Sequence, residues 1–147
     1  MDNIRFEVVS TFENHHINLP RRSTRHSCGY DFEAAEELFI EPDKIKLIPT
    51  GIKVYMPSNV YLQINSRSSL AVQRNIVVAQ GVGTIDADYY NNVKNEGHIL
   101  IPLLNRGKDT AVVKKGDRVA QGIFIRYETT EDDQVEVIRV GGFGSTG

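Results

Sequence analysis

Three segments of the chain combine residue types that can hold phosphate groups. In the first, residues 65–69, Ser66, Arg67, Ser68 and Ser69 follow a segment of alternating apolar residues and precede helix-forming ones. Backbone N–H groups at such a turn face outward toward an anion, and a guanidinium can bond two phosphate oxygens at once. For this segment taken alone, a serine-rich helix cap with an exposed arginine is the stronger interpretation.

The second segment is the glycine-rich end of the chain, from Arg139 to Gly147. Glycine lets the backbone approach an anion closely, and Ser145 and Thr146 add hydroxyl donors. The ring of Phe143 could stack on a flat ligand once this tail folds over it. On composition alone, a tail that closes over a ligand and a disordered terminus are about equally supported.

The third segment, residues 81–90, places two glycines before Asp86 and Asp88. Residues two apart on a strand point to the same face, and a pair of carboxylates there suits general-base catalysis or a metal ion. A turn that contains aspartate is the plainer alternative. The four histidines lack the spacing of metal ligands, so we expect no histidine metal site, and we expect Cys28 to be small core filling.

The elements that must position these groups are mostly strands. Alternating apolar residues, separated by turn signals about every ten residues, favour an all-β sandwich, barrel or jelly roll. Residues 68–73 have the composition for one or two helical turns, whereas residues 33–38 contain helix formers but form too short a segment. The expected strands are residues 4–9, 30–34, 44–48, 52–56, 60–65, 76–78, 99–104, 110–113, 119–127 and 134–138.

Length and composition narrow the class of protein. The chain has 147 residues, 40% of them hydrophobic and 24% charged, which predicts one folded domain spanning residues 1–147. A net charge of −2 gives no electrostatic reason to bind a nucleic-acid polymer. A single cysteine, no membrane-length apolar segment and no signal-peptide pattern predict a cytoplasmic protein that does not bind membranes.

Together and in order, five segments resemble the motifs of the trimeric dUTPases (deoxyuridine triphosphatases). The similarity runs from Cys28 to the last residue, and five motifs in order are far more specific than any one of them. The matching segments are Cys-Gly-Tyr-Asp-Phe-Glu-Ala at 28–34, Ser-Arg-Ser-Ser-Leu-Ala at 66–71, Gly-Thr-Ile-Asp-Ala-Asp-Tyr at 83–89, Lys-Gly-Asp-Arg-Val-Ala-Gln at 115–121 and Gly-Gly-Phe-Gly-Ser-Thr-Gly at 141–147.

The resemblance implies a jelly-roll-like homotrimer that hydrolyses dUTP to dUMP and pyrophosphate with Mg²⁺. That reaction limits uracil incorporation into DNA and supplies dUMP for thymidylate synthesis. In the family, the aspartate that matches Asp86 orients the attacking water and accepts its proton. Residues that match Arg67, Ser68, Ser69 and Gln121 contact the phosphates, and the one that matches Asp31 acts on the metal through water.

The resemblance also implies how the base and the sugar are selected. Uracil is expected near Gln80, Gly83, Thr84, Ile85 and Leu100, chiefly against backbone groups that cytosine would leave unpaired. The ring that matches Tyr89 packs under the deoxyribose and excludes a 2′-hydroxyl. The flexible C-terminal arm, residues 139–147, closes over the base, often from a neighbouring subunit. Its contacts are expected from Arg139, Phe143, Gly144, Ser145 and Thr146.

The main departure from the family pattern is an insert from Tyr90 to Gly97, of a kind that some phage members carry. A longer surface turn is its plain interpretation, and a regulatory protein partner is the alternative. Two rival functions stay open at this point. One is a dCTP deaminase, or a bifunctional relative, which shares the Arg-Ser-Ser-Leu-Ala segment but needs a glutamate that the segment 99–104 lacks. The other is a nucleotide-gated regulatory or binding protein with the same fold.

Overall fold

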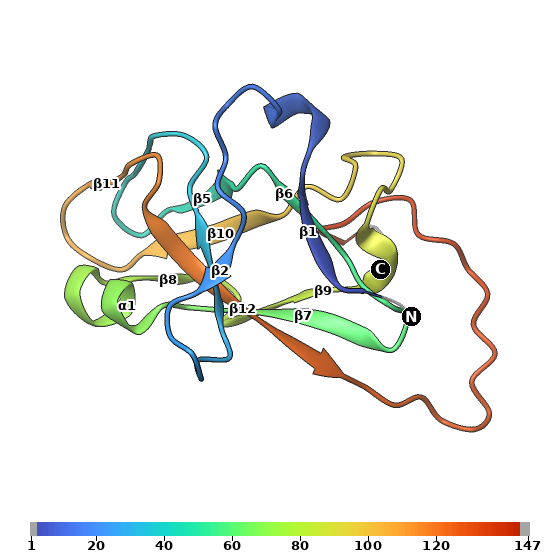
Figure 1. The fold of residues 1–147 in the computed structure, drawn as a ribbon. Helices are drawn as coiled ribbons and strands as arrows, with labels where there is room; N and C mark the ends of the chain where they lie inside the picture. Colours follow the sequence, from blue (N-terminus) through green and yellow to red (C-terminus); the bar gives the residue numbers. More distant parts are fainter. Residues whose placement is uncertain (1–2, 145–147) are drawn as a thin grey trace.

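The computed structural model describes residues 3–144 and consists mainly of antiparallel strands, with one short α-helix, α1, and two 3₁₀ turns, η1 and η2 (Figure 1). The strands are β1 (Arg5–Val8), β2 (Arg21–Arg22), β3 (Tyr30–Glu33), β4 (Leu38–Ile40), β5 (Ile45–Pro49), β6 (Ile52–Tyr55), β7 (Val60–Asn65), β8 (Ile76–Val78), β9 (Val82–Ile85), β10 (Leu100–Asn105), β11 (Ala111–Val113) and β12 (Arg118–Arg126). The helical elements are η1 (Ser10–Phe12), α1 (Ser68–Arg74) and η2 (Ala87–Tyr89).

The strands form small sheets packed around a common core, as in a jelly roll. The largest sheet has the order β2-β3-β12-β7-β9, and a second has the order β5-β10-β8. Two further pairs, β1 with β6 and β4 with β11, complete the described strands. The nine-residue strand β12 lies between β3 and β7 and crosses the molecule in Figure 1.

The alternation in the sequence matches burial in the structure. In β7, Val60, Leu62 and Ile64 are buried in the core, while the residues between them are partly exposed. In β10, Ile101 and Leu103 alternate in the same way. Burying each such side chain contributes roughly 1.5–3 kcal/mol to folding. The two strands are therefore held firmly in the core and fix the positions of the residues at their ends.

The helix predicted at residues 68–73 is confirmed as α1, which ends at Arg74 and is capped by Asn75 in the left-handed conformation with φ 55°. Residues 33–38, considered as a helical stretch, are not helical. The N–H of Ala34 donates to Asp117 O and that of Ala35 to Pro49 O, both at 2.8 Å. Backbone hydrogen bonds to distant segments therefore take the place of the hydrogen bonds that a helix would make here.

Other sequence expectations need correction. Residues 134–138 form no strand in the described chain; they belong to an extended arm on which Val135 and Val137 are exposed. Strands β2 and β4 are additional to those predicted, the strand considered within residues 81–90 is β9 and ends at Ile85, and Cys28 is exposed instead of filling the core. None of the helices within residues 3–144 has both the length and the apolar character needed to cross a membrane.

Candidate active site

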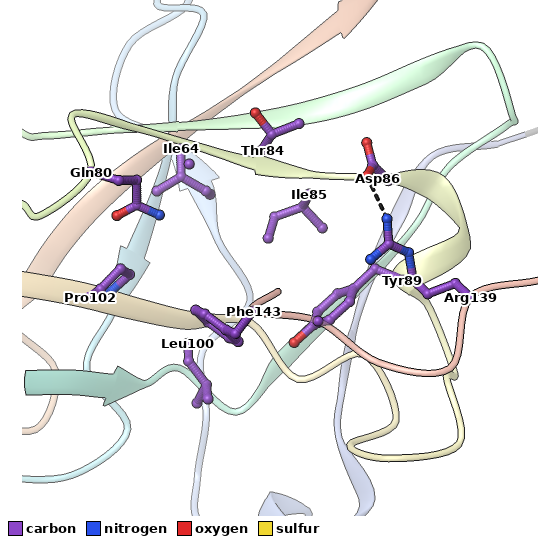
Figure 2. Close-up of a pocket in the computed structure, with 12 residues that line it drawn as sticks. Ile64, Gln80, Thr84, Ile85, Asp86, Tyr89, Leu100, Pro102, Arg139 and Phe143 are labelled. Atoms are coloured by element: carbon purple, nitrogen blue, oxygen red, sulfur yellow. Dashed lines mark hydrogen bonds and ion pairs between the residues drawn. The ribbon is translucent and has the colours of Figure 1, made fainter. Parts of the chain in front are cut away.

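A cavity of about 190 Å³ lies between β9, the start of β10 and the C-terminal arm (Figure 2). Apolar side chains line much of it, with the Gln80 amide at one end and Asp86 and Arg139 at the other (Figure 2), which suits a flat polar ring with a charged group attached. The lining residues are Ile64, Gln80, Gly83, Thr84, Ile85, Asp86, Tyr89, Leu100, Pro102, Arg139, Gly142 and Phe143.

Strand β9 supplies one wall of this cavity. It pairs with β7 on one side and is the last strand of its sheet, so its outer edge offers backbone N–H and C=O groups. Gly83 is needed for the close packing here. A Cβ on it would lie 3.2 Å from Cβ of Ile64 and 3.3 Å from Nε2 of Gln80. The glycine therefore leaves room for the Gln80 amide at the cavity wall (Figure 2).

The ring of Tyr89 is buried and forms another wall of the cavity. Its hydroxyl donates to His98 O at 2.7 Å and accepts a hydrogen bond from Nδ2 of Asn95, also at 2.7 Å. Burial raises the pKa of the phenol above its ordinary value, and the bond from Asn95 partly opposes this rise. The ring is therefore a neutral, fixed surface at physiological pH.

Asp86, Asp88 and Arg139 meet at one end of the cavity. Nη2 of Arg139 donates to Oδ2 of Asp86 and Nε donates to Oδ1 of Asp88, each at 2.7 Å. The expectation that the two aspartates share a strand face is wrong, because β9 ends at Ile85 and Asp86 precedes η2. The two carboxylates nevertheless converge on one guanidinium, which brings the arm to the cavity; Figure 2 shows the bond to Asp86.

The arm continues over the cavity past Arg139. Gly142 packs directly on the Tyr89 ring, and Phe143 lines the cavity although 60% of it is exposed. Gly144 ends the described chain, so the expected contacts of Ser145 and Thr146 lie outside the described residues. In this single chain the arm covers its own cavity.

The expected phosphate and metal residues form a second cluster around Asp31. Nε of Arg67 lies 3.2 Å from Oδ1 of Asp31, and Nη1 of Arg118 lies 4.0 Å from Oδ2. Gln121 is the neighbour of Asp31 across the sheet and donates to Ser66 O at 3.3 Å. Ser68 and Ser69 begin α1 immediately beside Arg67. The excess of guanidinium groups makes this cluster suitable for an anion.

Helix α1, which begins beside Arg67, and the turn η2, which follows Asp86, lie at opposite ends of β7 (Figure 1). Asp86 follows Ile85, which pairs with Leu62, whereas Arg67 comes two residues after Asn65. The two side chains are therefore about six residues apart along the strand, or roughly 20 Å at about 3.3 Å per residue. One chain does not bring all the predicted site residues together.

Three residues near these clusters were not among the predicted site residues. Arg118 contacts Asp31, and the register of β2 places Arg21 directly opposite Asp31. Asn95 bonds the Tyr89 hydroxyl from inside the insert. Arg118 lies within the fourth motif and could have been included. The contacts of Arg21 and Asn95 are with residues nearby in the sequence, but neither residue type lies in a recognisable motif, so nothing marked them as site residues.

The Asp31 cluster fits a magnesium ion that arrives with a phosphate ligand. Mg²⁺ keeps several waters and takes one or two carboxylates together with substrate phosphates, and Asp31 is a carboxylate of this kind among anion-binding groups. Within residues 3–144, the His, Cys, Asp and Glu side chains form no group of three or more that could hold a metal ion.

A cavity shaped for a flat ring beside a carboxylate, together with a separate arginine cluster, provides the groups that an enzyme acting on a nucleotide needs for the base and the phosphates. The dUTPase family model matches residues 15–147. The deoxyuridine 5′-triphosphate nucleotidohydrolase of Lactococcus lactis is 47% identical over 144 residues, covering 97% of this chain and 96% of that protein. The enzyme of the same name from Rickettsia felis is 42% identical and covers 95% of each. The chain belongs to the dUTPase family, which confirms the resemblance seen in the motifs.

Solved structures agree with this assignment. A dUTPase crystal structure from Streptococcus mutans has a TM-score of 0.82 and 39% identity, covering 86% of this chain and 98% of that one. The dUTPase of phage phi11 of Staphylococcus aureus, described as having a species-specific insert, has a TM-score of 0.75 at 24% identity, covering 93% and 98%. This second likeness concerns the fold alone, and both support the jelly-roll-like architecture.

Proposed function

We propose that this protein hydrolyses dUTP to dUMP and pyrophosphate, limiting uracil incorporation into DNA and supplying dUMP for thymidylate synthesis. The observation that carries the proposal is the cavity of this dUTPase-family chain, in which an apolar slot, a strand edge and a carboxylate adjoin. The slot takes a pyrimidine and its sugar, and Asp86 stands where the phosphate chain would leave it.

The base would be selected by the outer edge of β9. Uracil presents one N–H between two carbonyl groups, and the free edge of β9 offers backbone groups that can pair with this pattern. Cytosine would leave such groups unpaired in a partly closed cavity, which costs more than the loss of an apolar contact. The amide of Gln80 adds a donor and an acceptor at the same wall.

In the hydrolytic step, Asp86 would orient a water molecule toward the α-phosphorus and accept its proton. In the described structure this carboxylate is bonded to Arg139. An incoming triphosphate would compete for the guanidinium, because phosphate oxygens bind arginine at two points. Arg139 would then hold phosphate, the arm would stay over the bound nucleotide, and Asp86 would be free to act on water.

A complete site would need a second copy of the chain. The residues expected to contact phosphate lie with Asp31 at the far end of β7, where Arg67 is roughly 20 Å from Asp86. They are Arg67, Ser68, Ser69 and Gln121. We therefore propose a homotrimer in which one subunit's arginine cluster faces another's cavity. Asp31 would hold Mg²⁺ through water. When bound, this ion neutralises charge on the triphosphate.

We propose a cytoplasmic location, which is supported by the exposed Cys28, because a reducing compartment suits an unpaired thiol. The deaminase alternative is disfavoured, since β10 (Leu100–Asn105) carries no acid that could shuttle a proton. A regulatory protein partner at the loop from Tyr90 to Gly97 stays a prediction, tested by capture from the source cell with and without dUTP.

The test is release of pyrophosphate from dUTP, dCTP, dTTP and UTP, each with Mg²⁺ and with a chelator. The proposal expects dUTP to be the preferred substrate and activity to fall sharply without the metal. Ammonia from dCTP would indicate the deaminase instead. The absence of turnover with all four nucleotides, combined with tight dUTP binding, would favour the regulatory alternative.

A further inference from the structure

The insert between η2 and β10 is a closed, internally bonded loop instead of a simple long turn. The N–H of Asn91 donates to Glu96 O, the N–H of Glu96 to Asn92 O, and the N–H of His98 to Asn95 O, each at 3.0 Å. Gly97 has φ +87°, and a Cβ there would lie 2.8 Å from Tyr89 O. The loop therefore packs tightly onto the backbone of Tyr89.

Two asparagines of this loop hold Tyr89 at both its backbone and its hydroxyl. Nδ2 of the buried Asn92 donates to Tyr89 O at 2.8 Å and to Oδ1 of Asn95 at 2.7 Å. Nδ2 of Asn95 donates to the Tyr89 hydroxyl at 2.7 Å, and that hydroxyl donates to His98 O. These bonds fix the position of the Tyr89 ring in the cavity wall.

The loop is in turn fixed to the body of the protein through Glu96. Its carboxylate accepts hydrogen bonds from the Ser10 hydroxyl at 2.6 Å and from Nζ of Lys53 at 2.7 Å. Nζ of the buried Lys53 also donates to Oδ1 of Asn91 at 2.7 Å. A loop held in this way resists displacement when a ligand presses on the tyrosine.

We propose that Asn95 is a positioning residue for sugar selection: by holding the Tyr89 hydroxyl, it keeps the ring where a ribose 2′-hydroxyl would collide with it. This inference rests on the proposed function, because it takes Tyr89 to be the surface beneath the deoxyribose. It assigns a role to the insert, which supports the cavity wall from behind. A ring that can tilt would admit ribonucleotides more readily.

The most selective variant is Asn95→Asp. It keeps the size of the side chain and an oxygen to accept from Asn92 and Gly97, but it removes the N–H that the Tyr89 hydroxyl accepts. The hydroxyl has one proton, so it can then bond either the new carboxylate or His98 O, but not both. Val93→Ala is the matched control, because Val93 belongs to the same loop and is 85% exposed. The ratio of kcat/KM for UTP to that for dUTP should rise about fivefold in the aspartate variant, as expected for one lost hydrogen bond. It should be unchanged in the control.

A double-mutant cycle with Tyr89→Phe tests whether Asn95 acts through the hydroxyl. In the phenylalanine background the bond is already lost, so Asn95→Asp should raise the UTP ratio no further. An equal rise in both backgrounds would overturn the inference. It would also be overturned if the ratio stayed at the wild-type value in Asn95→Asp while the NMR signal of ¹³C-labelled Tyr89 Cζ had shifted.

Binding separates this inference from the proposed function. The affinities for dUMP and UMP can be compared by calorimetry whether or not the protein hydrolyses dUTP. If the wild type preferred dUMP, Asn95→Asp relaxed that preference and no dUTP were hydrolysed, the proposed function would fall while the positioning role stood. Equal relaxation by Val93→Ala would overturn the positioning role.

Discussion

Gly142 is the point at which the arm touches the cavity wall, and replacing it with alanine should impair closure without affecting the fold. A Cβ built on Gly142 would lie 2.6 Å from Cε1 of Tyr89, whereas ordinary contact begins at 3.4 Å. The arm would therefore have to retreat by at least 0.8 Å, because bonds from Asn95 and His98 hold the tyrosine. Misplacement on the order of 1 Å can cost about 100-fold in rate.

We expect Gly142→Ala to lower kcat/KM for dUTP roughly 10- to 100-fold, measured by pyrophosphate release, with the melting temperature unchanged. Gly141→Ala is the matched control. A Cβ there would lie 2.7 Å from Cδ of Lys94, the mobile part of an exposed side chain that can swing away. The control should lose less than about threefold. Equal activity in the two variants would refute the reasoning that the arm closes against Tyr89.

Three further predictions follow from the same structure. Tyr89→Ala should relax discrimination against UTP by about tenfold or more, and undiminished selectivity in steady-state assays would exclude the sugar-gate role. Deleting residues 141–147 should leave the melting curve intact while removing most of the turnover; loss of the fold would make the tail structural. The bond from Lys53 holds the pKa of Glu96 near 2, below its ordinary 4.5, so its stabilisation is present above pH 4.5 and is lost as the pH falls toward 2. Glu96→Gln should accordingly lower the melting temperature at neutral pH, and the gap to the wild type should close on acidification; a constant gap would contradict this.

The sequence predicted the strands that alternate cleanly, because one buried face leaves a period-two pattern, as in β7 and β10. It missed β2, because two exposed arginines carry no apolar alternation, although β2 pairs with the nearby strand β3. It also suggested a strand at residues 134–138, where the apolar alternation exists but the described chain provides no neighbouring strand.

The site could be predicted in part for similar reasons. Asp86, Tyr89, Gln80 and Phe143 line one cavity, as the motifs suggested. The contact of Asn95 with Tyr89 could not be foreseen, since an asparagine in a polar insert looks like any surface-loop residue. The separation of Arg67 from Asp86 could not be foreseen either, because it follows from the antiparallel register of β7 and β9.

The central claim is that Asp86 activates water for hydrolysis of dUTP, and Asp86→Asn tests it most directly. The amide keeps the shape of the side chain but cannot accept the proton, so we expect binding of a non-hydrolysable dUTP analogue to be retained and kcat to fall by about 100-fold or more. Calorimetry for binding and pyrophosphate release for turnover would be measured on the same preparation. Retained binding with turnover lost would agree with the account, and turnover at the wild-type rate would contradict it.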